Sequence, residues 1–256
     1  MRPIYFLPVL FLCLLGYGTC APAQEQEEEP PVAEQAAGVI QRAIAAHGMT
    51  DLNGKRISFA FRERDYGIEL QDGRYRYTRS FVDSTGQRVR DELTNEGLRR
   101  FRQDSAVGLS VKDSTAYAAS VNSVRYFFLL PFGLEDPAVQ AELLDTVGIG
   151  QSVYDRVRVT FSAQGGGTDH EDIYHYFFDR EDGQLDYLAY TFETDGGGIR
   201  FREAINKRRV GDVVVQDYVN YGLDGADRDI ATIARRYEAG ELPELSRIEN
   251  TSVRIK

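Results

Sequence analysis

The spacing of apolar residues divides the chain into helical and extended stretches. Ile40, Ala43 and Ile44 recur at helical spacing and Gly48 follows them, so we predict one amphipathic helix over about residues 32–46. Beyond it, apolar and polar residues alternate, which is typical of β-strands. The strands predicted in this half of the chain cover Ile57–Phe61, the stretch around Tyr75 and Tyr77, Gln87–Leu93 and Leu98–Arg102.

Helical signals return in the middle of the chain. The segment S-V-K-D at residues 110–113 has the form of a capping box and opens a broad apolar face that runs to Phe128. Next, Asp136 as the N-cap and Pro137 as the first helical residue predict a short helix that reaches Leu144. We therefore expect a helix, a loop and a second helix between two groups of strands.

Alternation resumes after residue 150 and continues over most of the C-terminal half. The predicted strands are the stretch around Val157 and Phe161, then Ile173–Phe178, Leu185–Phe192, Ile199–Glu203 and Val210–Tyr218. Turn-forming residues 179–183 predict that the second and third of these form a hairpin. A last helix over Ile230–Ala239 and a short extended tail complete the pattern.

Some of these strands are apolar on both sides. Tyr174, Tyr176 and Phe178 share one face, while Ile173 and Phe177 share the other, so both faces need a partner. With 15 Tyr, 14 Phe and no Trp, the chain can supply either a packed aromatic core or the lining of a ligand cavity, and both interpretations stay open. The candidate lining residues are Phe59, Phe61, Tyr75, Tyr77, Phe127, Phe132, Tyr176, Phe178, Tyr190 and Phe192.

Arginines occur in pairs two residues apart. The six pairs are Arg62/Arg64, Arg74/Arg76, Arg88/Arg90, Arg100/Arg102, Arg156/Arg158 and Arg200/Arg202. Because residues two apart on a strand share a face, they predict a guanidinium-rich face of the sheet. This face is either a solvated surface with cross-strand pairs to acids such as Glu63, Asp91 and Glu203, or a docking strip for anionic head groups.

The first 19 residues have the composition of a signal peptide. One early cation precedes an apolar run over residues 4–15, which is too short to span a bilayer core of about 30 Å. Cleavage before Cys20 would leave a cysteine for lipidation, although Tyr17 stands where lipoprotein signals usually have leucine. Cleavage after Ala23 would instead release a cysteine-free protein. We expect export to the periplasm or outer membrane, with a lipid anchor at Cys20.

Charge excludes one class of partner. Residues 20–33 contain the acidic run Q-E-Q-E-E-E-P-P and predict a disordered spacer. The chain has a formal net charge of −10, which becomes −11 without residues 1–19 because these hold one Arg and no acid. Such a surface repels phosphate backbones, so we expect no nucleic-acid partner. No later apolar stretch is long enough to cross a membrane, so membrane attachment depends on Cys20.

Signals for catalysis are sparse. His47, His170 and His175 are the three histidines, and T-D-H-E-D at residues 168–172 is the densest group of potential metal ligands. However, His170 and His175 are an odd number of residues apart, and no H-E-x-x-H or G-x-S-x-G motif is present. We expect no metal, no cofactor and no catalytic residue. A hydrolase that uses His170, His175 and Asp172 is the alternative, and His47 is expected to be a helix-terminal residue favoured by the helix dipole.

Several segments carry a resemblance to known proteins. They are Ala46–Gly48, Tyr126–Leu134, Tyr154–Phe161, Tyr174–Asp179 and Gly183–Leu185. The last three look like the strand-and-turn pattern F-D-x-x-x-G-x-L of periplasmic lipoprotein-localisation carriers of the LolA and LolB type. Over roughly residues 34–220, the segments together are similar to a family of exported, often lipid-anchored proteins of unknown function from Gram-negative bacteria. The resemblance implies an incomplete, strongly curved antiparallel barrel whose open side is covered by helices, an apolar ligand inside, and no catalytic residue.

We therefore predict one LolA-like α+β domain over residues 34–256, built on a strongly curved antiparallel sheet. The expected function is binding of an apolar or amphiphilic molecule, such as a lipid or an acyl chain, in the cell envelope without catalysis. Besides the hydrolase, a second alternative stays open, namely a scaffold that docks an envelope partner through its arginine-rich strand face.

Overall fold

The computed structural model describes residues 32–162, 172–193, 196–225 and 228–256. The predicted signal peptide (1–19), Cys20 and His170 lie outside these ranges. The first helix, α1 (Val32–Ala46), has the predicted bounds and begins inside the range 20–33 that we assigned to the spacer. Residues 31–256 form one compact unit. Within the described ranges, no helix is both long and apolar enough to cross a membrane.

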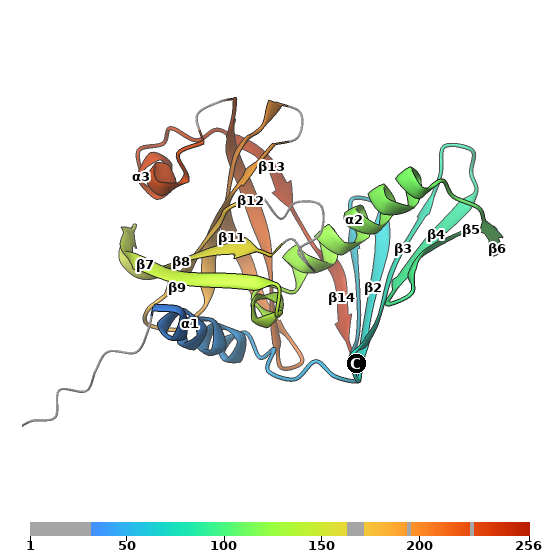
Figure 1. Ribbon diagram of the computed structural model, residues 1–256, viewed down its shortest axis with the longest axis horizontal. Helices are drawn as coiled ribbons and strands as arrows, with labels where there is room; N and C mark the ends of the chain where they lie inside the picture. Colours follow the sequence, from blue (N-terminus) through green and yellow to red (C-terminus); the bar gives the residue numbers. More distant parts are fainter. Residues whose placement is uncertain (1–31, 163–171, 194–195, 226–227) are drawn as a thin grey trace, which may run out of the picture. The chain divides into compact units, whose positions relative to one another are not determined.

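The described strands lie in two antiparallel sheets of seven strands each (Figure 1). Sheet A has the order β14 (Thr251–Ile255), β1 (Arg56–Phe61), β2 (Arg64–Gln71), β3 (Arg74–Val82), β4 (Arg88–Thr94), β5 (Gly97–Arg102), β6 (Ser105–Val107). Sheet B has the order β13 (Glu244–Ile248), β12 (Val213–Asp224), β11 (Gly198–Val210), β10 (Leu185–Phe192), β9 (Tyr174–Asp179), β8 (Ser152–Phe161), β7 (Val139–Ile149). The predicted α+β class, with antiparallel strands that do not close into a barrel, is confirmed. The strands form two sheets, whereas we predicted one curved sheet.

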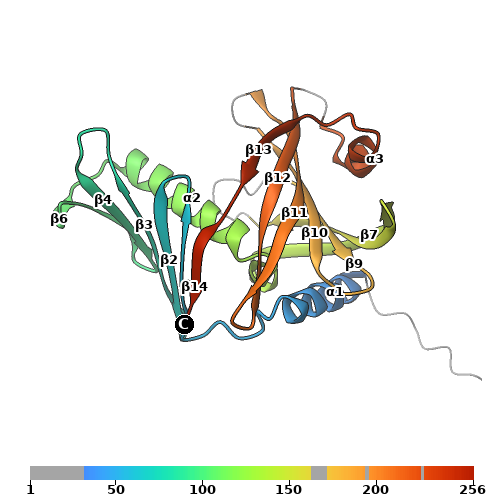
Figure 2. The ribbon, with the colours of Figure 1, turned by 180° about the vertical axis from the view of Figure 1, so that it is seen from behind.

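The C-terminal residues join the two sheets. β13 pairs with β12 in sheet B, and β14, which follows at once, pairs with β1 in sheet A (Figure 2). Asn250 lies at the crossing and is 6% exposed. Its backbone N donates to Asp217 Oδ1 at 2.8 Å, and its Nδ2 donates to the Gln216 carbonyl at 3.2 Å. Buried polar groups without hydrogen-bond partners cost free energy, and these bonds provide partners where the chain reverses.

One main core fills the inner faces of both sheets, meaning the faces that pack against α1 and α2. α2 (Val111–Phe128) starts as predicted at Ser110, whose Oγ accepts from Asp113 N at 3.1 Å. At its other end the Phe128 ring stacks on Phe59 of β1, with centroids 3.8 Å apart and an interplanar angle of 3°. The buried residues of α1 join the same core; they are Ala36, Ile40, Ala43 and Ile44.

A second core lies on the outer face of sheet B. Phe177 and Phe201 are fully buried there, and Phe201 stacks on Tyr237 at 4.6 Å between centroids. Tyr237 belongs to α3 (Ile233–Glu238), which follows the short 3-10 helix η3 (Ile230–Thr232). Both faces of β9 are therefore covered, as its doubly apolar sequence requires.

The structure differs from the prediction in one helix and in one additional strand. The helix predicted over Pro137–Leu144 is wrong, because Val139–Ile149 forms strand β7, preceded by the 3-10 helix η1 (Phe132–Glu135). Pairing with β8, in registers such as Leu143 opposite Val157, outweighs the local capping signal of Asp136. In addition, β2 was not predicted, although Tyr66 and Ile68 alternate toward the core.

The paired arginines do not share one face. Arg156/Arg158 and Arg200/Arg202 lie on strands β8 and β11 of sheet B, and the pairs on sheet A are divided between its two faces. Asp91 is fully buried on the inner face, where Arg79 Nη2 donates to Asp91 Oδ2 at 2.7 Å and Arg100 Nε to Asp91 Oδ1 at 2.6 Å. Arg79 Nη1 also donates to Ser120 Oγ of α2 at 2.7 Å. Asp91 was predicted to pair with arginine on a solvated face. The group is instead buried, because the registers of β3, β4 and β5 align Arg79, Asp91 and Arg100 beneath α2.

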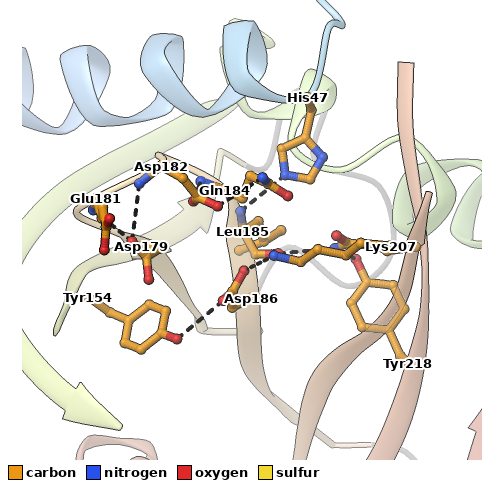
Figure 3. Close-up of polar contacts among 11 residues, drawn as sticks. His47, Tyr154, Asp179, Glu181, Asp182, Gln184, Leu185, Asp186, Lys207 and Tyr218 are labelled. Carbon is orange, nitrogen blue, oxygen red and sulfur yellow. Dashed lines mark hydrogen bonds and ion pairs between the residues drawn. The ribbon is translucent and has the colours of Figure 1, made fainter. Parts of the chain in front are cut away.

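The end of α1 is joined to sheet B by His47 and Gly48, and Figure 3 shows His47 beside Leu185. His47 is fully buried, and its Nε2 accepts from the backbone N of Leu185 at 3.1 Å. Burial, with a smaller contribution from Lys207, lowers the pKa of His47 to about 4. His47 lies at the helix end as expected, but its ring is neutral, so the helix dipole does not stabilise it as a cation. Gly48 has φ +67°, and a Cβ there would lie 1.9 Å from the carbonyl oxygen of Asp212.

Replacing Gly48 is expected to destabilise the fold. The change Gly48→Ala adds a left-handed strain of about 1–3 kcal/mol and a clash with the β11–β12 turn. Gly54→Ala is the matched control, because Gly54 has φ +74° and nothing within 4 Å of its Cβ position. Urea unfolding should show a clearly larger decrease in the free energy of unfolding for Gly48→Ala than for Gly54→Ala. Equal losses would mean that the close approach to Asp212 does not matter.

Stability should fall in mild acid. Burial also lowers the pKa of His175 to about 4, helped by Arg156 and Arg158. Since an unfolded histidine has a pKa of about 6.5, the unfolded chain binds protons that the folded chain does not between these values. The stabilisation is complete above pH 6.5 and is lost as the pH falls toward 4, by about 2 kcal/mol per histidine between pH 7 and pH 5.

Urea unfolding at pH 7 and pH 5 measures this loss, and the variants His47→Gln and His175→Gln should each reduce it. An unchanged pH dependence in both variants would contradict the assignment of neutral buried histidines.

Candidate functional site

A partly open hollow of about 470 Å³ lies along one flank of α2. We call it the α2 hollow. Its lining residues are Ser114, Thr115, Ala118, Ala119, Asn122, Ser123, Arg125, Tyr126 and Phe127 from α2; Leu93 from β4; Gly97 and Leu98 from β5; Gly133, Asp136 and Ala138 around η1; and Phe161 and Tyr174 from β8 and β9. Both sheets therefore contribute to it.

The hollow exists because this flank of α2 carries small side chains. Ala118 and Ala119 line it together with Leu93 and Leu98 of sheet A. The opposite flank of α2 bears Val121 and Phe128, which are buried in the main core. Because methyl groups cannot fill the space between the helix and two sheets, an apolar surface stays accessible to a ligand.

Aromatic rings form the wall toward sheet B. Tyr126 packs edge-on against Phe161 and Tyr174, with centroids 6.0 and 6.3 Å apart. The Tyr126 hydroxyl lies 2.6 Å from the Tyr176 hydroxyl, which fixes the ring, and burial raises the pKa of Tyr126. The wall is thus apolar toward the hollow and hydrogen-bonded behind it.

Two charged residues lie at the C-terminal end of α2. The Arg125 guanidinium lies 4.8 Å from the centre of the Tyr77 ring, and no carboxylate within the described residues is at ion-pair distance from it. Asp136 lines the same end, and its Oδ1 accepts from Ala138 N at 2.9 Å. The hollow therefore combines apolar and small polar side chains along α2 with charged groups at one end, which is suited to an amphiphile.

The ten candidate lining residues occupy different environments. Phe127 lines the hollow, and Tyr190 packs behind it with its centroid 5.5 Å from the Phe127 ring. Tyr176 and Phe178 are fully buried in the main core. The others on the inner faces are packed against or within this core and are Phe59, Phe61, Tyr75, Tyr77 and Phe132, while Phe192 lies beneath the Arg200 guanidinium at 4.3 Å. A ligand role for these residues stays a prediction.

Arg202 is a further buried cation behind Phe127. It is 8% exposed, its guanidinium lies 3.9 Å from the Phe127 ring centre, and its Nη2 donates to the Tyr190 hydroxyl at 2.9 Å. The positive charge lies against the ring face, where the π-electrons attract it. Arg202 therefore helps to hold Phe127 in the wall of the hollow.

Sequence reasoning missed most of the lining. Ala118, Asn122 and Arg125 recur at helical spacing on α2 and mark a flank of small or polar side chains. This signal was visible beside the apolar face of the same helix. Nothing local indicated that Leu93, Phe161 and Tyr174 would meet this flank, since they come from separate strands.

The predicted hydrolase site is only partly described. His175 is 3% exposed on the outer face of sheet B, Asp172 is half-buried just before β9, and His170 lies outside the described residues. Across the part of the chain that the structure describes, no three His, Cys, Asp or Glu side chains are grouped to hold a metal ion. The candidate residues are therefore not shown to meet.

The fold is similar to several solved structures at low identity. A LolA superfamily protein from Nitrosomonas europaea has a TM-score of 0.48 and 10% identity, covering 86% of this chain and 92% of that one. The lipoprotein LppX of Mycobacterium tuberculosis has a TM-score of 0.29 and 11% identity, covering 65% and 91%. MucB in complex with MucA(peri) has a TM-score of 0.26 and 12% identity, covering 75% of each chain.

No curated protein matches the sequence. The expected membership in a family of unknown function is confirmed, because the corresponding family model matches residues 8–250. The chain belongs to the family of unknown function DUF6503.

Proposed function

We propose that the protein binds the apolar chain of an amphiphile in the α2 hollow and acts as a binding protein without catalysis. The observation that carries this proposal is the hollow itself. Leucine, alanine and aromatic side chains line it together with the small polar residues Ser114, Thr115, Asn122 and Ser123, and Arg125 and Asp136 lie at one end. Small-molecule sites have this combination of an apolar lining and a few polar groups that set orientation. We further propose that the protein acts in the cell envelope, exported by residues 1–19 and tethered through Cys20.

The size of the hollow favours a single acyl chain. Its volume of about 470 Å³ falls in the lower half of the range for ligand pockets, which is about 300–1,000 Å³. A lipid with several chains would have to leave part of its apolar surface in water, at about 25 cal/mol per Å². Native mass spectrometry of protein purified from a membrane-containing fraction should therefore detect one bound single-chain molecule. Protein that carries no ligand, and that does not bind added oleate, would refute the proposal.

Filling the hollow should weaken this binding. Ala118→Phe places a ring in the lining, whereas Ala116→Phe adds the same ring to an exposed position of α2 outside it. Each buried CH₂ group contributes about 0.8 kcal/mol. If the ring displaces two or three methylene groups of oleate, the affinity should therefore fall roughly thirtyfold. Calorimetric titration with oleate measures the affinity. The site would be elsewhere if Ala118→Phe bound oleate as well as Ala116→Phe did.

Arg125 should select the head group. Its guanidinium has no carboxylate partner among the described residues, so it can pair with the acid of oleate. Arg125→Gln is expected to reduce oleate affinity by about tenfold or more, the value of a charge-assisted hydrogen bond, and to leave affinity for oleyl alcohol nearly unchanged. Asp136→Asn keeps the acceptor for Ala138 and should raise oleate affinity, because it removes a repelling charge. Equal effects on both ligands would show that Arg125 acts only through packing.

A further inference from the structure

The outer face of sheet A, which is turned away from α2, is basic although the chain as a whole is acidic. The strand registers place seven arginines and three carboxylates on it. The arginines are Arg56, Arg74, Arg76, Arg88, Arg90, Arg99 and Arg254, and the acids are Asp65, Glu69 and Glu92. The full chain has a formal net charge of −10. A local positive field therefore opposes the global charge.

This basic face has no helix on it in the described part of the chain. Both ribbon views show α2 on the opposite side of sheet A (Figures 1 and 2). Gly67 and the small side chains of Ser58 and Thr78 leave a depression of about 230 Å³ between the arginines of β1, β3 and β14. The backbone of the sheet is thus approachable from solvent between the guanidinium groups.

The carboxylates on the face neutralise only part of its charge. Glu69 pairs with Arg76 at 2.9 Å and with Arg56 at 3.8 Å. Glu92 forms ion pairs with Arg90 and with Arg76. Among the described residues, the arginines without a carboxylate at ion-pair distance are Arg74, Arg88, Arg99 and Arg254. Unpaired cations spread over four strands favour an extended anionic partner over a single small anion.

Apolar side chains accompany the charges. The Phe101 ring lies on the same face between the guanidinium groups of Arg90 and Arg99, at 4.3 and 5.2 Å from its centre. Val82, at the end of β3, is 68% exposed on this face. Arginine with exposed apolar side chains is the composition of surfaces that lie at a membrane interface.

We infer that the outer face of sheet A docks onto an anionic membrane surface. Acidic head groups attract basic residues near the surface, while Phe101 and Val82 contact the acyl boundary. This inference does not depend on the α2 hollow, because it uses different residues on the opposite face of sheet A. It explains why a chain with excess acid keeps seven arginines on one sheet face.

The test compares two triple variants of equal net charge in the exported chain carrying Cys20→Ser, which prevents acylation. Arg88→Gln, Arg99→Gln and Arg254→Gln remove three unpaired charges from the basic face. Lys112→Gln, Arg209→Gln and Arg235→Gln remove three exposed charges outside this face. Cosedimentation is measured with vesicles of phosphatidylcholine, with and without phosphatidylglycerol, at low and high salt. Circular dichroism and melting confirm that each variant is folded.

The parent should bind phosphatidylglycerol vesicles more tightly than phosphatidylcholine vesicles, and added salt should weaken the difference. The sheet variant should lose about fivefold in affinity per arginine, or roughly a hundredfold in all, while the control keeps most of its affinity. Equal losses of vesicle affinity in both variants would show that only the net charge matters and would overturn the inference. A parent that shows no preference for phosphatidylglycerol would also overturn it and would leave an acidic protein as the partner of this face.

Discussion

A strand with apolar side chains on both faces cannot leave either face in water, and β9 of this protein is such a strand. Tyr176 and Phe178 lie on one side and Phe177 on the other, and all three are fully buried. Sheet B must therefore be covered twice, by α1 and α2 on the inner face and by α3 on the outer face. This requirement accounts for the positions of α1 and α3, whereas most of α2 packs on β3, β4 and β5 of sheet A.

The covering helices also explain why the α2 hollow exists. α2 packs against both sheets, with Phe128 stacked on Phe59 of sheet A and the Tyr126 hydroxyl against Tyr176 of sheet B. It also contacts sheet A through Ser120, whose Oγ accepts from Arg79 Nη1 at 2.7 Å, while the same guanidinium pairs with the buried Asp91. A helix fixed in this way cannot move to close the space beside Ala118. The hollow is thus a consequence of two well-packed contacts separated by a flank of small side chains.

Local patterns predicted the elements but not their meeting points. Ser110 as the cap of α2, the β9–β10 hairpin and the bounds of α1 could be read from spacing, because each depends on neighbours in sequence. β7 could not, since the pairing that stabilises it involves β8 and outweighs the capping signal of Asp136. The candidate aromatics were chosen by face alone, so core residues such as Phe178 could not be distinguished from Phe127, which lines the hollow.

The central claim is that an apolar chain lies along the small-residue flank of α2. Photocrosslinking with a diazirine analogue of palmitate, followed by peptide mapping, tests it most directly. We expect labels on the segment from Ala118 to Phe127 and on the strand ends at Phe161 and Tyr174. Labels confined to other surfaces, such as the outer face of sheet A or the α3 side of sheet B, would contradict the claim.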